Sequence, residues 1–431
     1  MSRLGAKGRS PGAEKWLILG VNRNGGSTAV RVKQGSPIGA QAVRLGDPER
    51  SDCDLVFVAG PEVEPLLEAS LDGLLGMMHG ARRPAVILLP WMASPEWAVR
   101  FDGVVRSFGC GRATFRSLVA QSGERGVEGL CFGLLDGIMN QRLAVDRLAV
   151  RQLGHGGSGG QGEGPFELVT GQEACPTGLI MAHRGRRLHL RTALRYLSRA
   201  AGAGVRARIG LDEDDPAAYA SVAAAYPKAQ FFRLVPPGAG PYVVRQELAK
   251  RSKEPLLVFH DSDDLSCFDR FVAQQEELRN TGCDMVGCHE MRVDEMEQEV
   301  TAIRFPLDVT AALAERGGHR LWHPTTMVKR EAFWSSGGFS TDRKIANDSQ
   351  FLLRAHFGMK IRNLDGFVYL RRKHRSALTV APGTALDQPI RQQLSKVWLR
   401  DFEAVKRGEM RIEESSLWPV EGTTRHRLYR M

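Results

Sequence analysis

Short apolar runs alternate with segments of helical spacing along most of this chain. In its N-terminal part the runs Trp16–Val21, Asp54–Ala59 and Ala85–Leu89 predict strands, and the patterns over Val63–Met78 and Leu130–Val150 predict helices. Such alternation is typical of an α/β domain with a mostly parallel sheet. We therefore expect a small α/β accessory domain over residues 1–153, for which the sequence indicates no chemistry.

A glycine-rich segment, 154–165, separates this part from the rest and predicts a flexible linker. It contains a formal G-x-G-x-x-G match from Gly154 to Gly159. A phosphate-binding loop of that type follows a strand and opens a helix, and neither pattern flanks this match. We interpret the segment as a domain boundary.

After the linker the alternation becomes regular. The patterns predict strands at Gly178–Ala182, Arg206–Leu211, Phe231–Val235 and Pro255–His260, and helices at Leu188–Ala201, Pro216–Ala225 and Tyr242–Lys250. This βαβαβ order predicts a doubly wound sheet, which binds ligands beyond the carboxyl ends of its strands. We expect one catalytic domain over residues 166–383 and a basic, helical C-terminal extension over 384–431.

Acidic residues stand at two of these strand ends. Asp212 follows one strand, and the cluster Asp261-Ser-Asp-Asp264 follows another. Three carboxylates within four residues repel one another unless positive charge lies among them. Mg²⁺ or Mn²⁺ is a natural partner for such oxygen ligands. The alternative is a solvated acidic turn or a helix cap.

Composition and charge narrow the class of protein. With 431 residues, 42% hydrophobic and 25% charged, the chain is long enough for two globular domains. Its apolar stretches are too short for a membrane span or a secretory signal, and its seven scattered cysteines suit reduced thiols, so we expect a cytoplasmic protein. Part of the net charge of +10 lies in the tail, where residues 371–431 hold 13 Lys/Arg against 7 Asp/Glu.

The basic tail has several interpretations. It is a solvated helix, or it contacts the inner face of a membrane, a polyanionic acceptor or nucleic acid, and the solvated helix is favoured over any one of these contacts. No recognisable nucleic-acid-binding module accompanies it, so we expect no nucleic-acid partner.

Residues 179–379 carry several ordered motifs that resemble glycosyltransferase family 2. Its opening strand "V-I-I-P-x-Y-N-R" is similar to Leu179-Ile-Met-Ala-His-Arg-Gly-Arg186, and "V-D-D-G-S" to Ile209-Gly-Leu-Asp-Glu-Asp-Asp215. "N-x-G-x-x-x-A-R-N" is similar to Gly238-Ala-Gly-Pro-Tyr-Val-Val-Arg-Gln246, and "D-x-D-D" to Asp261–Asp264. Further on, "E-D-x-x-x-x-x-R" resembles Asn347-Asp-Ser-Gln-Phe-Leu-Leu-Arg354, and "Y-R-x-H-x-x-S-x-T" resembles Leu370–Thr379.

The resemblance implies a GT-A fold, a Rossmann-like doubly wound mixed sheet, and inverting transfer of a sugar from a nucleotide-sugar, by default a UDP-sugar. The acceptor would be a hydroxyl of a glycan, a lipid-linked molecule or a small molecule, as in polysaccharide biosynthesis. The chain departs from the motifs at Ala182 and His183, which stand in place of Pro and Tyr, and at Asn347, which stands in place of Glu.

The resemblance also implies roles for individual residues. Asp348 is the candidate general base, with a helix cap as its alternative. The candidate ligands of the nucleotide-sugar are Asp212, Arg245, Asp261 and Asp263, and those of Mn²⁺ or Mg²⁺ are Asp263, Asp264 and His374. His323-Pro324 is a candidate for the acceptor side of the site.

Two other functions fit parts of the sequence. A catalytically inactive nucleotide-sugar-binding module would explain Asn347. A phosphatase of the haloacid-dehalogenase type has an apolar strand followed by D-x-D-x-[T/V], which Val258–Leu265 resembles apart from Leu265 at its end. There the first aspartate is a nucleophile and the second an acid/base.

Overall fold

The computed structural model describes residues 16–22, 85–88, 126–141, 147–153, 175–200, 204–267 and 270–431. The chain divides into two compact units: Met1–Leu134 with Leu143–Leu168, and Leu135–Arg142 with Val169–Met431. None of the described helices is long and apolar enough to cross a membrane.

The first unit contains a parallel three-stranded sheet in the order β2-β1-β3. Its strands are β1 (Trp16–Asn22), β2 (Ala85–Leu88) and β3 (Arg147–Leu153). The first two confirm predicted strands. The predicted helix over Leu130–Val150 is wrong in its second half: helix α4 spans Gly126–Met139, and the chain then enters β3. The predictions for 54–59 and 63–78, and most of the proposed accessory domain, lie outside the described residues.

The second unit begins with the predicted alternation of strands and helices. Its first elements are β4 (Thr177–His183), α5 (Arg187–Ala200), β5 (Val205–Leu211), the 3-10 helix η2 (Pro216–Tyr219), α6 (Ala220–Ala225), β6 (Gln230–Val235), α7 (Pro241–Arg251) and β7 (Leu256–Asp261). All of the strands and helices predicted for this stretch are confirmed, with ends that differ by a few residues.

The remaining elements complete the unit. They are β8 (Leu265–Ser266), α8 (Arg270–Thr281), β9 (Met285–Cys288), β10 (Glu290–Asp294), β11 (Glu299–Ile303), α9 (Val309–Glu315), η3 (His323–Thr325), β12 (Met327–Lys329), α10 (Arg330–Ser335), α11 (Asn347–Ala355), β13 (Ile361–Leu364), β14 (Tyr369–Lys373), α12 (Pro389–Lys406), η4 (Ile412–Glu414) and β15 (Arg427–Arg430).

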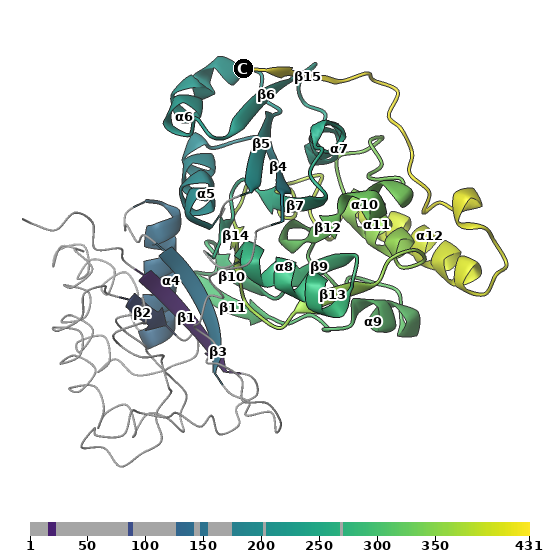
Figure 1. Cartoon of the computed structure of the whole chain (residues 1–431), viewed down its shortest axis with the longest axis horizontal. Coiled ribbons are helices and arrows are strands. Elements are labelled where there is room, and N and C mark those ends of the chain that lie inside the picture. The colour runs from purple at the N-terminus through teal and green to yellow at the C-terminus, as the bar shows by residue number, and fades with distance from the viewer. Residues whose placement is uncertain are drawn as a thin grey trace, which may run out of the picture. The chain divides into compact units, whose positions relative to one another are not determined.

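An eight-stranded mixed sheet in the order β13-β9-β12-β7-β4-β5-β6-β15 forms the centre of this unit (Figure 1). Strands β7, β4, β5 and β6 are parallel, whereas β12 and β15 run antiparallel to their neighbours β7 and β6. The C-terminal segment therefore adds an edge strand to the sheet, besides the helix α12 that the sequence led us to expect.

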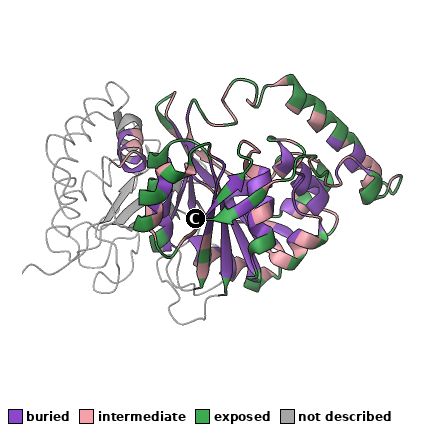
Figure 2. Ribbon diagram, turned by 90° about the horizontal axis from the view of Figure 1, so that it is seen from above, coloured by how far each residue is buried: buried purple, intermediate pink, exposed green. Residues whose placement is uncertain are grey.

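Both faces of the sheet are buried. Successive side chains of a strand point to opposite sides, so each strand contributes residues to both faces. In β4, Leu179 and Met181 pack into a core with α5, α6 and α8, while Ile180 packs into the core with α7, α10, α11 and α12. Figure 2 shows these strands as the buried centre of the unit. Burial on both faces explains why the strands are continuous apolar runs.

A second, four-stranded sheet in the order β11-β10-β14-β8 adjoins the acidic cluster. Strand β14 pairs with β10 in parallel and with β8 antiparallel. Because β8 begins at Leu265, directly after the cluster, this pairing brings the segment 369–374 beside Asp261–Asp264.

Candidate active site

A cleft of about 1390 Å³ lies at the carboxyl ends of β4, β5 and β7. All seven predicted site residues line it: Asp212, Arg245, Asp261, Asp263, Asp264, Asp348 and His374. The volume exceeds that of typical pockets for a single small ligand, which are about 300–1,000 Å³. The cleft therefore has room for two substrates side by side.

The acidic cluster is the polar centre of this cleft. Carboxylate oxygens of Asp261, Asp263 and Asp264 all lie within 4.8 Å of one another. They come together because β7 ends at Asp261 and the next three residues turn into β8.

Each carboxylate of the cluster has a different partner. Asp261 accepts a hydrogen bond from buried Arg245. An oxygen of Asp263 lies 2.7 Å from Nε2 of His374. Asp264 is buried and accepts bonds of 2.7 Å from the Tyr369 hydroxyl and from a backbone N–H of β14.

The crowding of negative charge shows in the titration of the cluster. Burial and the charge of Asp263 raise the pKa of Asp261 to about 6, against the opposing effect of Arg245. Burial and the two neighbouring carboxylates also raise the pKa of Asp264. Burial acts in the same direction on Asp263, but the hydrogen bond and charge of His374 outweigh it and hold the pKa of Asp263 at about 2. Burial and mutual repulsion therefore disfavour ionisation of Asp261 and Asp264, and the ion pair with Arg245 offsets this only in part at Asp261.

Asp348 stands in the first turn of α11, after Ala346, whose φ of +65° is left-handed. Burial opposes its ionisation, yet the charges of His323 and His319 and a hydrogen bond from the Tyr242 hydroxyl lower the pKa of Asp348 below its ordinary value. The carboxylate is thus ionised at neutral pH and lines the cleft. An ionised carboxylate facing a substrate cleft can accept a proton.

Arg245 connects the acidic cluster with the candidate base. It lies on α7, ion-paired with Asp261, and its guanidinium stands 5.3 Å from the ring centroid of Tyr242, which in turn bonds Asp348. Burial disfavours its charge, but Asp261, Tyr242 and Asp348 together raise the pKa of Arg245.

Asp212 shapes the loop that precedes α7. Its buried carboxylate accepts hydrogen bonds from the backbone N–H groups of Gly238, Ala239 and Gly240, at 2.5, 3.1 and 2.8 Å. Gly238 and Gly240 have φ values of +84° and +91°, which glycine adopts without strain. Much of the hydrogen-bonding capacity of Asp212 is therefore used in holding this loop at the edge of the cleft.

Asn347 contributes to structure and does not line the cleft. Its side chain is fully buried, and Nδ2 donates to the carbonyl oxygens of Ser340 and Arg343, at 2.8 and 2.9 Å. A glutamate has no donor for these two acceptors. The presence of Asn347 in place of Glu is thus explained by the loop that its side chain holds. The next residue, Asp348, still lines the cleft.

The sequence did not single out two buried residues of β14 that support the cluster. The Tyr369 hydroxyl donates to Asp264, and Arg372 donates from Nε to the backbone oxygen of Asp263 at 3.0 Å. Arg372 also pairs with Glu295 at 2.7 Å. Tyr369 directly precedes the segment matched to the family's "Y-R-x-H" motif. A tyrosine one position away from that motif is the feature of the sequence that could have pointed to this residue.

Two further histidines line the cleft from β4 and α5. Nδ1 of His183 lies 2.8 Å from the Ser262 hydroxyl, and burial lowers the pKa of His183 to about 4. Burial, followed by the charge of Arg372, lowers the pKa of His189 to about 3, and its ring packs against that of His374. Both imidazoles are therefore neutral near pH 7. The sequence around His189 predicts a helix and contains no motif that marks this residue as part of the site.

His323 is not on the cleft wall, contrary to the interpretation from sequence. It is buried between Phe259 and Phe339, with ring centroids 4.6 and 4.9 Å away, and borders a small cavity behind Asp348. Pro324 does line the cleft.

Comparisons with known proteins give structural matches only. No family model and no curated protein matches the chain. It is similar to S. aureus TarS 1-349 in complex with UDP-GlcNAc, with a TM-score of 0.41 and 13% identity over 53% of this chain and 72% of the other. It is also similar to the mannosyltransferase PcManGT from Pyrobaculum calidifontis in complex with GDP-Man and Mn²⁺, with a TM-score of 0.40 and 15% identity over 54% and 64%.

These structural matches cover about half of this chain. Identities this low say nothing about which residues act.

Proposed function

We propose that this chain is a glycosyltransferase that moves a sugar from a nucleotide-sugar to an acceptor hydroxyl with inversion, and that it depends on a divalent metal. One observation carries the proposal: three crowded carboxylates at a strand end share a cleft with an ionised Asp348. A crowded cluster of buried carboxylates suits a divalent cation that carries a diphosphate, and a separate carboxylate suits a hydroxyl proton.

The residues of the cluster fit a hard cation such as Mn²⁺ or Mg²⁺. Among the described residues, the side-chain hydrogen bonds of Asp261 use Oδ1 and those of Asp263 use Oδ2, which leaves one oxygen of each for a ligand. Each oxygen of Asp264 accepts one hydrogen bond, so Asp264 would hold a metal through a remaining lone pair. We propose Asp263, Asp264 and His374 as the metal ligands. The metal would supply Lewis-acid neutralisation of the leaving diphosphate.

The remaining steps fall to side chains of the cleft. Asp348 takes the proton of the acceptor hydroxyl, whose oxygen forms the new bond to the anomeric carbon. The bond from that carbon to the diphosphate breaks, and its electron pair leaves with the diphosphate oxygen. Asp212, Arg245 and Asp261 bind the nucleotide-sugar, and Arg245 places positive charge near the leaving group. By resemblance to the family, the donor is a UDP-sugar.

The phosphatase alternative requires Asp261 as a nucleophile. That carboxylate is ion-paired with buried Arg245, which lowers its nucleophilicity. The inactive-module alternative rested on Asn347, which the structure accounts for without reference to activity.

Turnover of a donor panel tests the proposal. The protein is mixed with Mn²⁺ and UDP- or GDP-sugars, and free nucleotide is measured together with the anomeric configuration of the released sugar. We expect slow nucleotide release with inversion that EDTA abolishes. Orthophosphate release from simple phosphate esters would support the phosphatase, and metal-dependent binding without turnover would support the inactive module.

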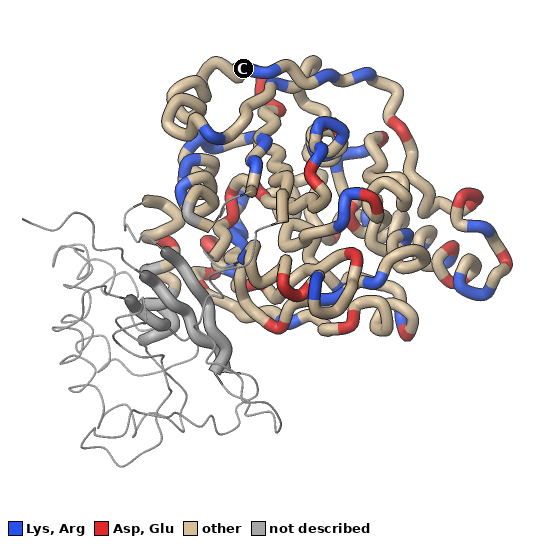
Figure 3. Tube along the Cα trace, in the orientation of Figure 1, with Lys and Arg blue, Asp and Glu red and all other residues tan. Residues whose placement is uncertain are grey.

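Peripheral membrane contact by the basic tail remains a prediction. Figure 3 shows that Lys and Arg are interspersed with acidic residues along α12, which lowers the attraction to an anionic surface. Co-sedimentation with anionic vesicles at low salt, lost at high salt, would support the contact, and no association at low salt would exclude it.

A further inference from the structure

One wall of the cleft has no task in the donor chemistry proposed above. It is built around Trp322, Arg371 and Arg292, all of which line the cleft. The Arg371 guanidinium carbon lies 3.7 Å from the centroid of the Trp322 ring. Such a stack covers the face of the guanidinium and leaves its N–H edge free to point at a ligand.

This wall has more positive than negative charge. Arg371 and Arg292 both approach the same oxygen of Glu290, whose side chain is fully buried. Two guanidinium groups therefore share one carboxylate, which leaves a net positive charge. The side chain of Arg292 is 30% exposed, so a molecule in the cleft can reach it.

Arg371 is also poorly saturated with hydrogen bonds. Its guanidinium lies 3.4 Å from an oxygen of Glu290 and 3.3 Å from the Thr379 hydroxyl, and both distances are near the limit for a hydrogen bond. Nε1 of Trp322 and Nε of Arg292 lack hydrogen-bond partners among the described residues, as does Oε2 of Glu290. Two of these three groups are donors only, which suits a ligand that accepts hydrogen bonds.

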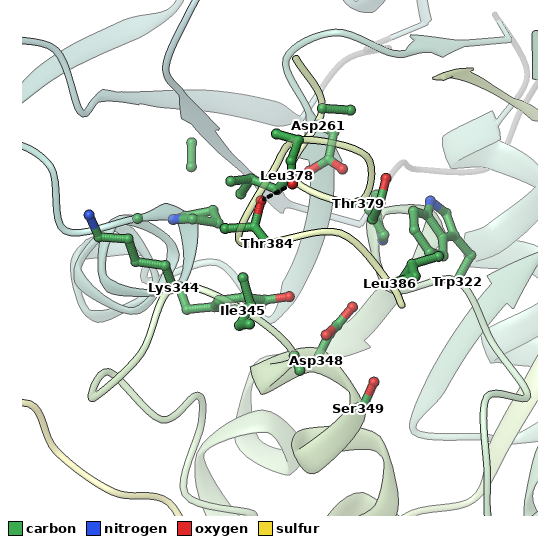
Figure 4. A pocket seen from close by; sticks show the side chains of 18 of the residues that line it. Asp261, Trp322, Lys344, Ile345, Asp348, Ser349, Leu378, Thr379, Thr384 and Leu386 are labelled. Atoms are coloured by element: carbon green, nitrogen blue, oxygen red, sulfur yellow. Dashed lines mark hydrogen bonds between the residues drawn. The ribbon is translucent and has the colours of Figure 1, made fainter. Parts of the chain in front are cut away.

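The wall lines the same cleft as the acidic cluster and the candidate base. The charge of Arg371 acts on Asp261. His319, which packs edge-on against Trp322 with ring centroids 5.6 Å apart, acts on Asp348. Figure 4 shows Trp322 and Asp348 around the same pocket as Asp261. A second substrate in this cleft can therefore contact the wall.

Helix α12 also contributes positive charge to the lining of the cleft. Arg391 and Lys396 of α12 line the cleft and, within the part of the chain that the structure describes, have no carboxylate at salt-bridge distance. The described acidic residues that line the cleft are the five aspartates with proposed roles: Asp212, Asp261, Asp263, Asp264 and Asp348.

We propose that Arg292, Arg371 and Trp322 form an acceptor subsite for an oxyanion, so that the acceptor is a hydroxyl compound that also carries a carboxylate or a phosphate. This proposal rests on the proposed function, because it assigns the second substrate of that reaction. Bidentate binding of carboxylate or phosphate by arginine is the chemistry that recognises it.

Three matched alcohols test the subsite with the full-length protein, Mn²⁺ and its preferred donor. They are methyl glucoside, methyl glucuronide and methyl glucoside 6-phosphate, and the measurement is the acceptor-dependent increase in nucleotide release. We expect at least one anionic alcohol to exceed the neutral one by about tenfold or more in kcat/KM, since charge-assisted hydrogen bonds are at stake. The two anionic arms distinguish a carboxylate from a phosphate.

Variants locate the effect. Arg292→Gln should remove most of the preference for anionic acceptors and leave acceptor-independent donor hydrolysis and donor KM unchanged. Arg292→Lys should retain part of the preference for anionic acceptors. The control Arg407→Gln, at an exposed arginine, should change none of these quantities. Retained donor hydrolysis also shows that the Gln variant is folded. Equal responses to all three alcohols, including no response, would overturn the subsite while donor hydrolysis still supports the transferase. A rise in donor KM in Arg292→Gln, with the anionic preference intact, would also overturn it.

Discussion

Nε2 of His374 lies 2.7 Å from a carboxylate oxygen of Asp263, although 111 positions separate the two residues in the sequence. The contact exists because β14 pairs with β8, so the segment after β14 passes beside the residues that follow β7. It keeps the Asp263 carboxylate ionised at low pH, and it links the C-terminal part of the cleft to the proposed metal site.

Removal of the candidate base should affect the chemical step. We expect Asp348→Asn to lower kcat by about 10²–10⁴-fold, the usual contribution of a general base, and to leave donor KM largely unchanged. The amide keeps the shape of the carboxylate but cannot take the proton. Steady-state kinetics measure the effect, with exposed Glu331→Gln as the control. An Asp348→Asn variant with full kcat would remove this residue from the mechanism.

Asn347 offers a test of its structural role. Asn347→Asp should destabilise the protein by about 3–5 kcal/mol, because it loses two donated hydrogen bonds and places a buried charge against two carbonyl oxygens. Denaturant unfolding gives the change, and exposed Asn280→Asp is the matched control. We also expect no gain of turnover in Asn347→Glu. A stable and more active Glu variant would contradict the role assigned here.

Metal binding should depend on pH. Burial raises the pKa of Asp261 to about 6, so this carboxyl is partly protonated in weakly acidic solution, and burial and the neighbouring carboxylates also raise the pKa of Asp264. A cation competes with those protons, so its apparent affinity should rise as pH increases through 6, by up to about tenfold per unit for each proton released. Titration with Mn²⁺ at pH 5, 6 and 7 measures the trend. A flat profile would mean that Asp264 does not bind the metal and that the charge of Asp261 does not act on it.

A buried ion pair far from the chemistry stabilises the sheet. Arg208 of β5 donates two bonds of 2.9 Å to Glu254, just before β7, and both side chains are buried. Glu254→Gln should lower the free energy of unfolding by about 3–5 kcal/mol, because the arginine keeps its charge without a partner. The double variant Arg208→Met/Glu254→Leu should recover much of the loss. If the single and the double variant were both as stable as the wild type, the ion pair would contribute little to the free energy of unfolding.

The sequence predicted the parts of the site that depend on local pattern. Strands β4 to β7 were recognisable because burial on both faces makes them apolar runs, and parallel strands place their carboxyl ends at one edge. Asp212 and Asp261 could be assigned to that edge for this reason. The same argument predicts that the acidic cluster lies where a doubly wound sheet binds its ligands.

Other features depend on contacts between distant segments. The pairing of β15 with β6 and the burial of Arg372 beneath the cluster follow from tertiary packing, which periodicity does not report. The predicted helix over Leu130–Val150 runs into the first residues of β3 because a short apolar segment after a helix fits both periods. The sequence treats His323-Pro324 as one candidate for the acceptor side, but only Pro324 lines the cleft, because the histidine packs in the aromatic core.

The dependence of nucleotide release on Mn²⁺, compared between the wild type and Asp263→Ala, tests the central claim most directly. With a nucleotide-sugar that the protein turns over, release by the wild type should rise with Mn²⁺ and saturate. In Asp263→Ala it should fall by about 100-fold or more at every Mn²⁺ concentration, since the metal loses a ligand and the leaving diphosphate its neutralising charge. Unchanged, Mn²⁺-dependent release by Asp263→Ala would contradict the account.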